Sequence, residues 1–263
     1  MVKLLKLLLA LFLLLAIAGV AYYSVYPDVA RLKRVNPGKT AFMAYREREW
    51  KEKGKKVRIR RRWVGFSHIS PYVAKAVVIS EDDKFWSHRG FDLDALEKAV
   101  EEDLKAGRLK FGGSTISQQL VKNLYLSPSK NPFRKLTEAL ITRRLEKTLS
   151  KKRILELYLN VAEWGEGIFG VEAASLYYYG KPSALVTAEE AARLAAVLPN
   201  PRRYGVNDAS GHVRKRAEAI YAIMVKRGVV VEYYEDASRE AKQERPPADG
   251  SDKLDWPGTA GSP

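Results

Sequence analysis

The sequence contains no cysteine, which excludes disulfide bonds, thiolate metal sites and a cysteine nucleophile. It also shows no internal repeat, and no alternating polar and apolar run long enough for a sheet-based domain. Acidic residues are in the minority, since 31 Asp and Glu face 46 Lys and Arg, for a net charge of +15. Such a surface attracts nucleic acid, anionic lipid headgroups or phosphorylated substrates, and charge alone does not choose among them.

The N-terminus carries a long apolar run, Leu7–Tyr26, of about the 20 residues that a spanning helix requires. Lys3 and Lys6 precede it, and we interpret residues 1–26 as an uncleaved transmembrane anchor. Two alternatives are a signal peptide cleaved near Ala16–Ala18 and a buried soluble helix, although no polar face interrupts the run. Basic residues on both flanks leave the orientation open on charge alone.

Residues 27–66 follow as a linker, Pro27–Gly38, and a basic juxtamembrane region. Lys51–Arg62 in this region holds eight basic residues and one acidic residue. Three interpretations are open: a solvated strand or loop, a patch against anionic lipid, or a nucleic-acid site, for which a recognition helix is missing. At the other end, residues 233–263 are rich in Pro, Gly, Ser and charge, so we predict a disordered tail.

Residues 67–232 lie between these segments, and their patterning predicts a mainly α domain. Apolar residues recur there at spacings of three and four, which predicts helices at Val73–Ile79, Leu93–Leu104, Ile116–Leu124, Leu136–Leu149, Ile154–Leu159 and Ala188–Leu198. Clusters of Gly and Pro separate these stretches and mark the turns between them.

Two polar segments of this domain contain candidate catalytic residues. Ser80–Asp92 contains Glu81, and Arg134–Glu146 contains Glu138. Several cations precede or open the second segment: Lys122, Lys130, Arg134 and Lys135. Two carboxylates plus several cations are the groups needed to move a sugar away from a phosphate leaving group.

The helix predicted at Ile116–Leu124 has one apolar stripe and one polar face. Gly112 and Gly113 allow a tight turn before it, and Ser114 is the expected N-cap. The polar face gathers four side chains: Thr115, Gln118, Gln119 and Lys122. Uncapped N–H groups beside these hydroxyls favour a bound anion, whereas the alternative is an ordinary surface helix.

These segments resemble, in order, the motifs of a known family. They read EDDKFWSHRGFD, GGSTISQQLVKNL, RKLTEALITRRLE, KKRILELYLN and AEEAARLAAVLPNP. The resemblance covers residues 67–228 and is to the peptidoglycan glycosyltransferases, lysozyme-like membrane enzymes that polymerise lipid II. We expect a monofunctional member, because the segment NVAEWGEGIFGVEAAS is similar and no transpeptidase domain follows in 263 residues. The implied fold is a lysozyme-like glycosyltransferase domain behind one N-terminal transmembrane helix.

The resemblance implies catalytic roles for both glutamates. Glu81 falls on the family's general base, which takes the proton of the acceptor's 4-hydroxyl. Glu138 falls on a glutamate that assists the donor diphosphate, directly or through a divalent ion. The structural alternative for Glu138 is a helix-surface ion pair with Arg134.

The resemblance also implies which residues bind the substrate and which support the site. The residues implied in holding the donor's phosphates are Lys122, Arg134 and Lys135, with Ser114, Thr115, Gln118 and Gln119 beside them. Lys130 falls where relatives often carry arginine. Lysine keeps the positive charge, but it cannot make the two parallel hydrogen bonds that a guanidinium group makes to a phosphate. The supporting residues implied are Asp82, Phe85, His88 and Asn160. We expect Asp82 to hold a local hydrogen-bond network and His88 to be a packed side chain rather than a ligand.

The implied reaction is an inverting transfer from a lipid-linked glycan to lipid II, forming a β-1,4 link and releasing undecaprenyl diphosphate. A divalent cation, Mg²⁺ or Mn²⁺, is implied as a weakly bound cofactor shared with the substrate diphosphate. The implied setting is the periplasmic side of a bacterial inner membrane, with other cell-wall synthases as candidate partners and no nucleic acid. Two alternatives are a lysozyme-like hydrolase or lytic transglycosylase, which has no evident need for the cations, and a non-enzymatic membrane adaptor.

Overall fold

The computed structural model describes residues 2–97, 101, 113–128, 133–207 and 211–230. Three predictions lie outside these residues wholly or in part: the role of Lys130, the disordered tail 233–263 and the later part of the helix at Leu93–Leu104. The described part is mainly helical, which confirms the predicted fold class.

Five helices of the domain, between Pro71 and Val197, fall where the apolar spacing predicts them, to within one helical turn at each end. In chain order the helices of the described part are α1 (Val2–Val25), α2 (Ala41–Glu52), α3 (Pro71–Glu81), α5 (Ile116–Tyr125), α6 (Phe133–Thr148), α7 (Lys151–Val161), α8 (Val171–Tyr179), α9 (Ala188–Val197) and α10 (His212–Lys226). Short 3-10 turns lie at η1 (Ala30–Lys33), η2 (Phe66–His68) and η3 (Ser183–Leu185). The sequence did not predict α2, α8 or α10 as separate helices.

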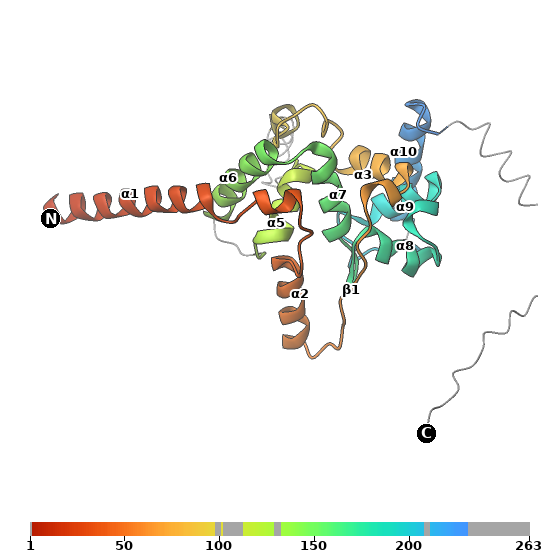
Figure 1. Cartoon of the computed structure of the whole chain (residues 1–263), viewed down its shortest axis with the longest axis horizontal. Coiled ribbons are helices and arrows are strands. Elements are labelled where there is room, and N and C mark those ends of the chain that lie inside the picture. The colour runs from red at the N-terminus through yellow and green to blue at the C-terminus, as the bar shows by residue number, and fades with distance from the viewer. Residues whose placement is uncertain (1, 98–100, 102–112, 129–132, 208–210, 231–263) are drawn as a thin grey trace, which may run out of the picture.

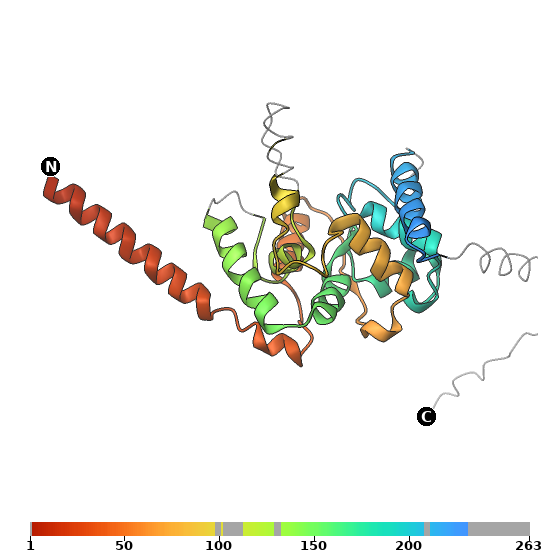
Figure 2. The same cartoon turned by 90° about the horizontal axis from the view of Figure 1, so that it is seen from above.

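Helix α1 projects away from the rest of the molecule (Figures 1 and 2). Its stretch Lys3–Tyr23 is long and apolar enough to cross a membrane, and the leucines between Leu4 and Leu14 are exposed. The helix ends at Val25, where the following Pro27 prevents its continuation. Arg144 of α6 donates to the main-chain oxygens of Tyr23, Val25 and Pro27 at 3.1, 2.6 and 3.1 Å. Carbonyls that a helix end leaves unpaired are therefore satisfied by the body of the molecule.

The segment Pro27–Gly38, expected to be a linker, is packed against the domain instead. Leu32 is buried in the main core. Its main-chain oxygen accepts a hydrogen bond from Arg153 Nε at 2.8 Å. Arg61 donates to the main-chain oxygens of Pro37 and Gly38. The expectation was wrong because these contacts come from arginines far along the chain, which local composition does not reveal.

The core joins two groups of helices. Helix α9 packs against both α3 and α10, while α5 packs against α6 and α7. The predicted apolar stripe of α5 is confirmed, since Ile116 and Leu120 are fully buried and Leu124 nearly so. Each such side chain contributes about 1.5–3 kcal/mol when buried. Because α3 and α5 are both anchored in this core, the residues at the end of α3 face the start of α5.

A small sheet connects the basic region to the domain. Its strands are β1 (Arg60–Arg61), β2 (Glu163–Gly165) and β3 (Ile168–Phe169), in the order β1-β3-β2. Strand β1 pairs parallel to β3, and β2 pairs antiparallel to it. The segment Lys51–Arg62 forms the end of α2, a connection and one short strand, and most of its side chains are exposed. Its three interpretations remain predictions.

Candidate active site

Glu81 is the last residue of α3, where the backbone leaves the helix at Asp82. Its side chain is 9 % exposed, and Oε2 accepts a hydrogen bond from Gln119 Nε2 at 2.9 Å. Oε1 accepts a longer one from Ser80 Oγ at 3.3 Å. One carboxylate oxygen is therefore held by Gln119, and the other makes only a longer hydrogen bond.

Gln119 is itself held by Tyr158 of α7. The Tyr158 hydroxyl donates to Gln119 Oε1 at 3.0 Å, so the amide must present its NH₂ group to Glu81. Burial raises the pKa of Tyr158 well above its ordinary value, and the charges of Glu81 and Asp82 act in the same direction. The hydroxyl thus stays a donor at any pH at which the protein works.

Arg216 of α10 is a site residue that the sequence did not predict. Its Nη2 donates to Ser80 Oγ at 3.0 Å and lies 3.8 Å from Glu81 Oε1. It stands 136 positions from Ser80. It lies in none of the recognised motifs, so no local pattern could have revealed the contact.

The start of α5 is closed by protein groups rather than open to an anion. Thr115, not Ser114, is the N-cap, and Thr115 and Gln118 form a reciprocal capping box. Asp82 Oδ2 accepts from Ile116 N at 2.8 Å, so a carboxylate of the chain occupies the place expected for a bound anion. The prediction of uncapped N–H groups was therefore wrong. Ser114 nevertheless lies next to the site, since its main-chain oxygen accepts from Gln119 Nε2 at 3.4 Å.

The predicted roles of Asp82 and His88 in a local network agree with the geometry. Gly90 N donates to His88 Nδ1 at 3.0 Å, so the proton lies on Nε2, which is 2.8 Å from Asp82 Oδ1. Phe85 is fully buried beneath this loop, with the ammonium of Lys151 4.5 Å from its ring centroid. These residues tie the loop after α3 to the start of α5 and keep Glu81 in place.

A second charged cluster lies on α6. Glu138 is buried, and its two oxygens accept from Lys135 Nζ at 2.5 Å and from Arg134 Nη1 at 3.3 Å. The predicted pair with Arg134 is thus present. Lys122 of α5 interacts electrostatically with Glu138 and with Glu81. Burial is the main cause that lowers the pKa of Lys122, and Arg134 and Lys135 lower it further.

The remaining predicted residues fall outside this cluster. Lys130 lies beyond the described residues. Asn160 is fully buried, where its side chain accepts from Val64 N and donates to Val64 O, both at 2.9 Å. It therefore holds the chain behind the site, as expected of a supporting residue.

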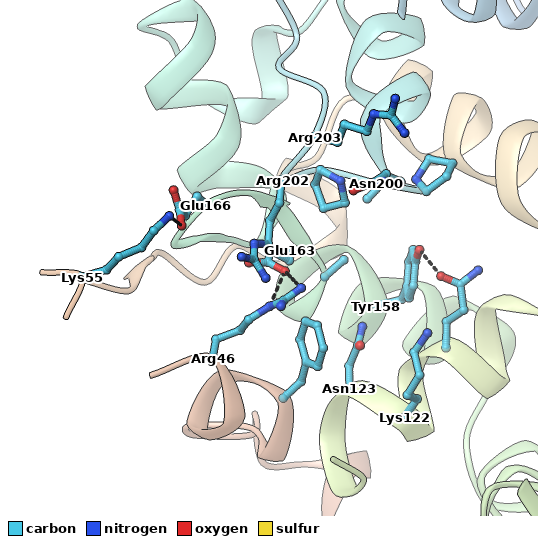
Figure 3. Close-up of a pocket in the computed structure, with 16 residues that line it drawn as sticks. Arg46, Lys55, Lys122, Asn123, Tyr158, Glu163, Glu166, Asn200, Arg202 and Arg203 are labelled. Carbon is cyan, nitrogen blue, oxygen red and sulfur yellow. Dashed lines mark hydrogen bonds and ion pairs between the residues drawn. The ribbon is translucent and has the colours of Figure 1, made fainter. Parts of the chain in front are cut away.

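Gln119 and Lys122 line a cavity of about 450 Å³ that extends towards α2 and the end of α9 (Figure 3). Other residues on its wall are Phe42, Arg46, Asn123, Glu163, Asn200 and Arg202. In Figure 3, Arg46 reaches Glu163, and their closest atoms are 2.8 Å apart. Burial raises the pKa of Glu163 although Arg46 opposes the rise, and Glu163 Oε1 has no hydrogen-bond partner among the described residues. Local sequence gave no signal for this wall, because it combines segments far apart in the chain.

The described residues do not form a metal cage. None of their His, Asp and Glu side chains gather in a group of three that could hold an ion. Glu138 is the carboxylate nearest the cations, and both of its oxygens are already engaged by Lys135 and Arg134. Lys122, Arg134 and Lys135 therefore outnumber the single carboxylate of Glu138 in this cluster.

The carboxylate of Glu81, held by Gln119, and the neighbouring cations Lys122, Arg134 and Lys135 are groups that an enzyme needs to transfer a sugar from a diphosphate. Comparison with known proteins agrees. Residues 48–225 match the family model described as Transglycosylase, and the chain belongs to that family.

Several curated relatives carry the name biosynthetic peptidoglycan transglycosylase. The protein of Nitrosospira multiformis is 46% identical over 215 residues, which cover 82% of this chain and 94% of the relative. That of Dechloromonas aromatica is 48% identical over 190 residues, or 72% of this chain and 82% of the relative. That of Azoarcus sp. is 51% identical over 180 residues, or 68% and 78% respectively.

Proposed function

We propose that this chain polymerises the glycan strands of peptidoglycan from lipid II. The oxygen of the acceptor's 4-hydroxyl attacks the anomeric carbon of the lipid-linked donor from the face opposite the phosphate. The bond from that carbon to the phosphate oxygen breaks, and undecaprenyl diphosphate leaves with the electron pair. The product has an inverted, β-1,4 link. The observation that carries this proposal is the held carboxylate of Glu81 together with the Lys122, Arg134 and Lys135 cations.

Glu81 is the proposed general base. Gln119 holds Oε2, which leaves Oε1 to take the proton from the attacking hydroxyl. A positioned base contributes about 10²–10⁴-fold to a rate. Arg216 lies close to the same oxygen and, in this proposal, helps to fix the orientation of the carboxylate.

The diphosphate is the proposed ligand of the cations. Lys122, Arg134 and Lys135 would neutralise the charge that develops on the leaving oxygen, as is usual for phosphate leaving groups. Glu138 holds two of these cations in position through its ion pairs. We retain Lys130 and Ser114 as proposed contacts. We propose that Thr115 and Gln118 act through the shape of the helix start, because their polar atoms are used in the cap.

A divalent cation remains a proposal for the substrate complex. Because both Glu138 oxygens are engaged and the described residues offer no cage, Mg²⁺ or Mn²⁺ would be held mainly by the diphosphate. The proposed reaction does not require this cation. When bound, it would further neutralise the charge that develops on the leaving oxygen.

We also propose the setting of the reaction. Helix α1 would anchor the chain in the inner membrane and leave the domain on the periplasmic side, where lipid-linked glycan is presented. Other cell-wall synthases are proposed partners, and nucleic acid is not. Arg144, which binds the end of α1, would keep the domain close to the bilayer surface.

Separate incubations with lipid II and with finished peptidoglycan distinguish a glycosyltransferase from a hydrolase. The purified chain should convert lipid II into glycan strands and release undecaprenyl diphosphate, while leaving finished peptidoglycan uncut. Soluble fragments from finished peptidoglycan, without polymer from lipid II, would support the hydrolase or lytic transglycosylase instead.

A further inference from the structure

A second cavity, of about 880 Å³, lies between the loop that follows α3 and the C-terminal part of α6. Its wall includes Trp86 and Arg89 from that loop, and Arg143 and Lys147 from α6. None of Glu81, Lys122 and Glu138 lines it. The reaction proposed above therefore makes no use of this cavity.

The charges of this cavity are unbalanced. Lys151 also lines it, but its ammonium is paired with Glu146 at 2.7 Å. Arg89, Arg143 and Lys147 are exposed and have no ion pair or hydrogen bond from their side chains to any residue that the structure describes. Three cations without a carboxylate partner in one concave surface attract an anion.

The cavity is also close to the proposed membrane anchor. Arg143 and Lys147 are one helical turn apart on α6, so they share a face. Arg144, the residue after Arg143, binds the carbonyls at the end of α1. Figures 1 and 2 both show α6 beside the point where α1 leaves the domain. The free cations thus lie near the level at which the anchor would emerge from the bilayer.

Trp86 adds a second feature of a lipid contact. Its side chain is 56% exposed, and its ring packs edge-on to the buried Phe85 at a centroid distance of 5.1 Å. An exposed indole held in this way is typical of the interface between a membrane and water. Cations and an indole together suit a phosphodiester at the bilayer surface.

We infer that Arg89, Arg143 and Lys147, with Trp86, form a binding site for the phosphodiester headgroup of an anionic phospholipid. This inference rests on the proposal that α1 spans the membrane. Occupancy of the site would hold the domain against the bilayer at a second point beside the anchor. The expected ligand is a lipid with net negative charge, such as phosphatidylglycerol, in preference to phosphatidylcholine.

Native mass spectrometry of the full chain in zwitterionic detergent tests the site. Phosphatidylglycerol, phosphatidylcholine and inorganic phosphate are titrated separately. The test variant is Arg143→Gln/Lys147→Gln. The matched control is Lys215→Gln/Lys226→Gln on α10, which removes the same charge from the opposite end of the molecule. The variant Arg143→Lys/Lys147→Arg keeps the charge.

Wild type should bind phosphatidylglycerol more tightly than phosphatidylcholine or phosphate. The test variant should lose about fivefold in affinity for each cation removed, or about 25-fold in all. The control and the charge-keeping variant should bind as wild type does. Equal binding of both lipids, an equal loss in the control, or equally tight binding of free phosphate would overturn the inference.

Polymerisation of lipid II in detergent without phospholipid separates this site from the active site. The test variant should keep the wild-type KM and kcat there. A raised KM for lipid II would make the cavity a substrate subsite and would also overturn the inference. Wild type that binds phosphatidylglycerol but makes no polymer would instead contradict the proposed function and leave the lipid site standing.

Discussion

Tyr158→Phe tests how the catalytic carboxylate is held. The change removes one buried hydroxyl, which donates to Gln119 Oε1 at 3.0 Å, and leaves the ring in place. The Gln119 amide then loses the only partner of its oxygen among the described residues, and its orientation is less firmly fixed. The hydrogen bond of 2.9 Å that its NH₂ group donates to Glu81 is thereby weakened.

The size of the effect follows from the hydrogen bonds involved. A hydrogen bond to a charged group contributes about 1.5–3 kcal/mol, which corresponds to about 10- to 150-fold in rate. Gln119 Nε2 has a second, weaker acceptor in Ser114 O at 3.4 Å, and this contact favours the original orientation. We therefore expect a fall in kcat near the lower end of the range, about tenfold.

Tyr179→Phe is the matched control. Its hydroxyl donates to Glu190 O at the same 3.0 Å, away from the site. Both variants should lose about 0.5–1.5 kcal/mol in the free energy of unfolding. Polymerisation of lipid II in detergent should slow in Tyr158→Phe alone. Equal kcat values for the two variants would refute the argument that Tyr158 orients Gln119.

Three further predictions concern other parts of the molecule. Because the pKa of Lys122 is lowered, activity should fall at high pH as its ammonium loses a proton, and Lys122→Arg should move that fall to higher pH in a pH–rate profile. Hydrogen bonds from Lys53 and two arginines lower the pKa of Glu49 from 4.5 to about 2. The ionised Glu49 carboxylate therefore stabilises the fold above pH 4.5, and this stabilisation is lost as the pH falls towards about 2. Glu49→Gln should therefore lower the melting temperature at pH 7 and have little effect near pH 2, and an equal effect at both would contradict this. Gly170 has φ +84°, and an added Cβ would lie 2.8 Å from Asn160 O. Gly180 has φ +66°, but no atom lies close to its added Cβ, so Gly180→Ala should lower the free energy of unfolding by about 1–2 kcal/mol. A denaturant titration should show a larger loss for Gly170→Ala.

The helices that carry the site could be predicted because their patterns are local. Ile116, Leu120 and Leu124 recur at helical spacing, and all three are buried. The cap was misplaced by one residue, since Ser114 and Thr115 are both good caps. Gln118, three residues after Thr115, is the capping-box signal that distinguishes them.

The rest of the site depends on contacts between distant segments, which local patterns do not contain. Arg216 reaches Ser80 across 136 positions, and Arg46 reaches Glu163 across 117. The packing of Leu32 likewise depends on Arg153, so composition alone made Pro27–Gly38 resemble a linker. The predicted roles of Glu81 and Glu138 came from resemblance to a family, and the structure adds the partners that hold each one.

The most direct test of the proposed function compares two neighbouring carboxylates in one assay. Glu81→Gln and Asp83→Asn each replace a carboxylate by an amide, but Asp83 is exposed and paired with Arg227. With purified full-length chain and lipid II in detergent, wild type and Asp83→Asn should make glycan strands at similar rates. Glu81→Gln should be slower by at least about 10²-fold, because the amide cannot accept the proton. Polymerisation by Glu81→Gln at the wild-type rate would contradict the assignment of Glu81 as the general base.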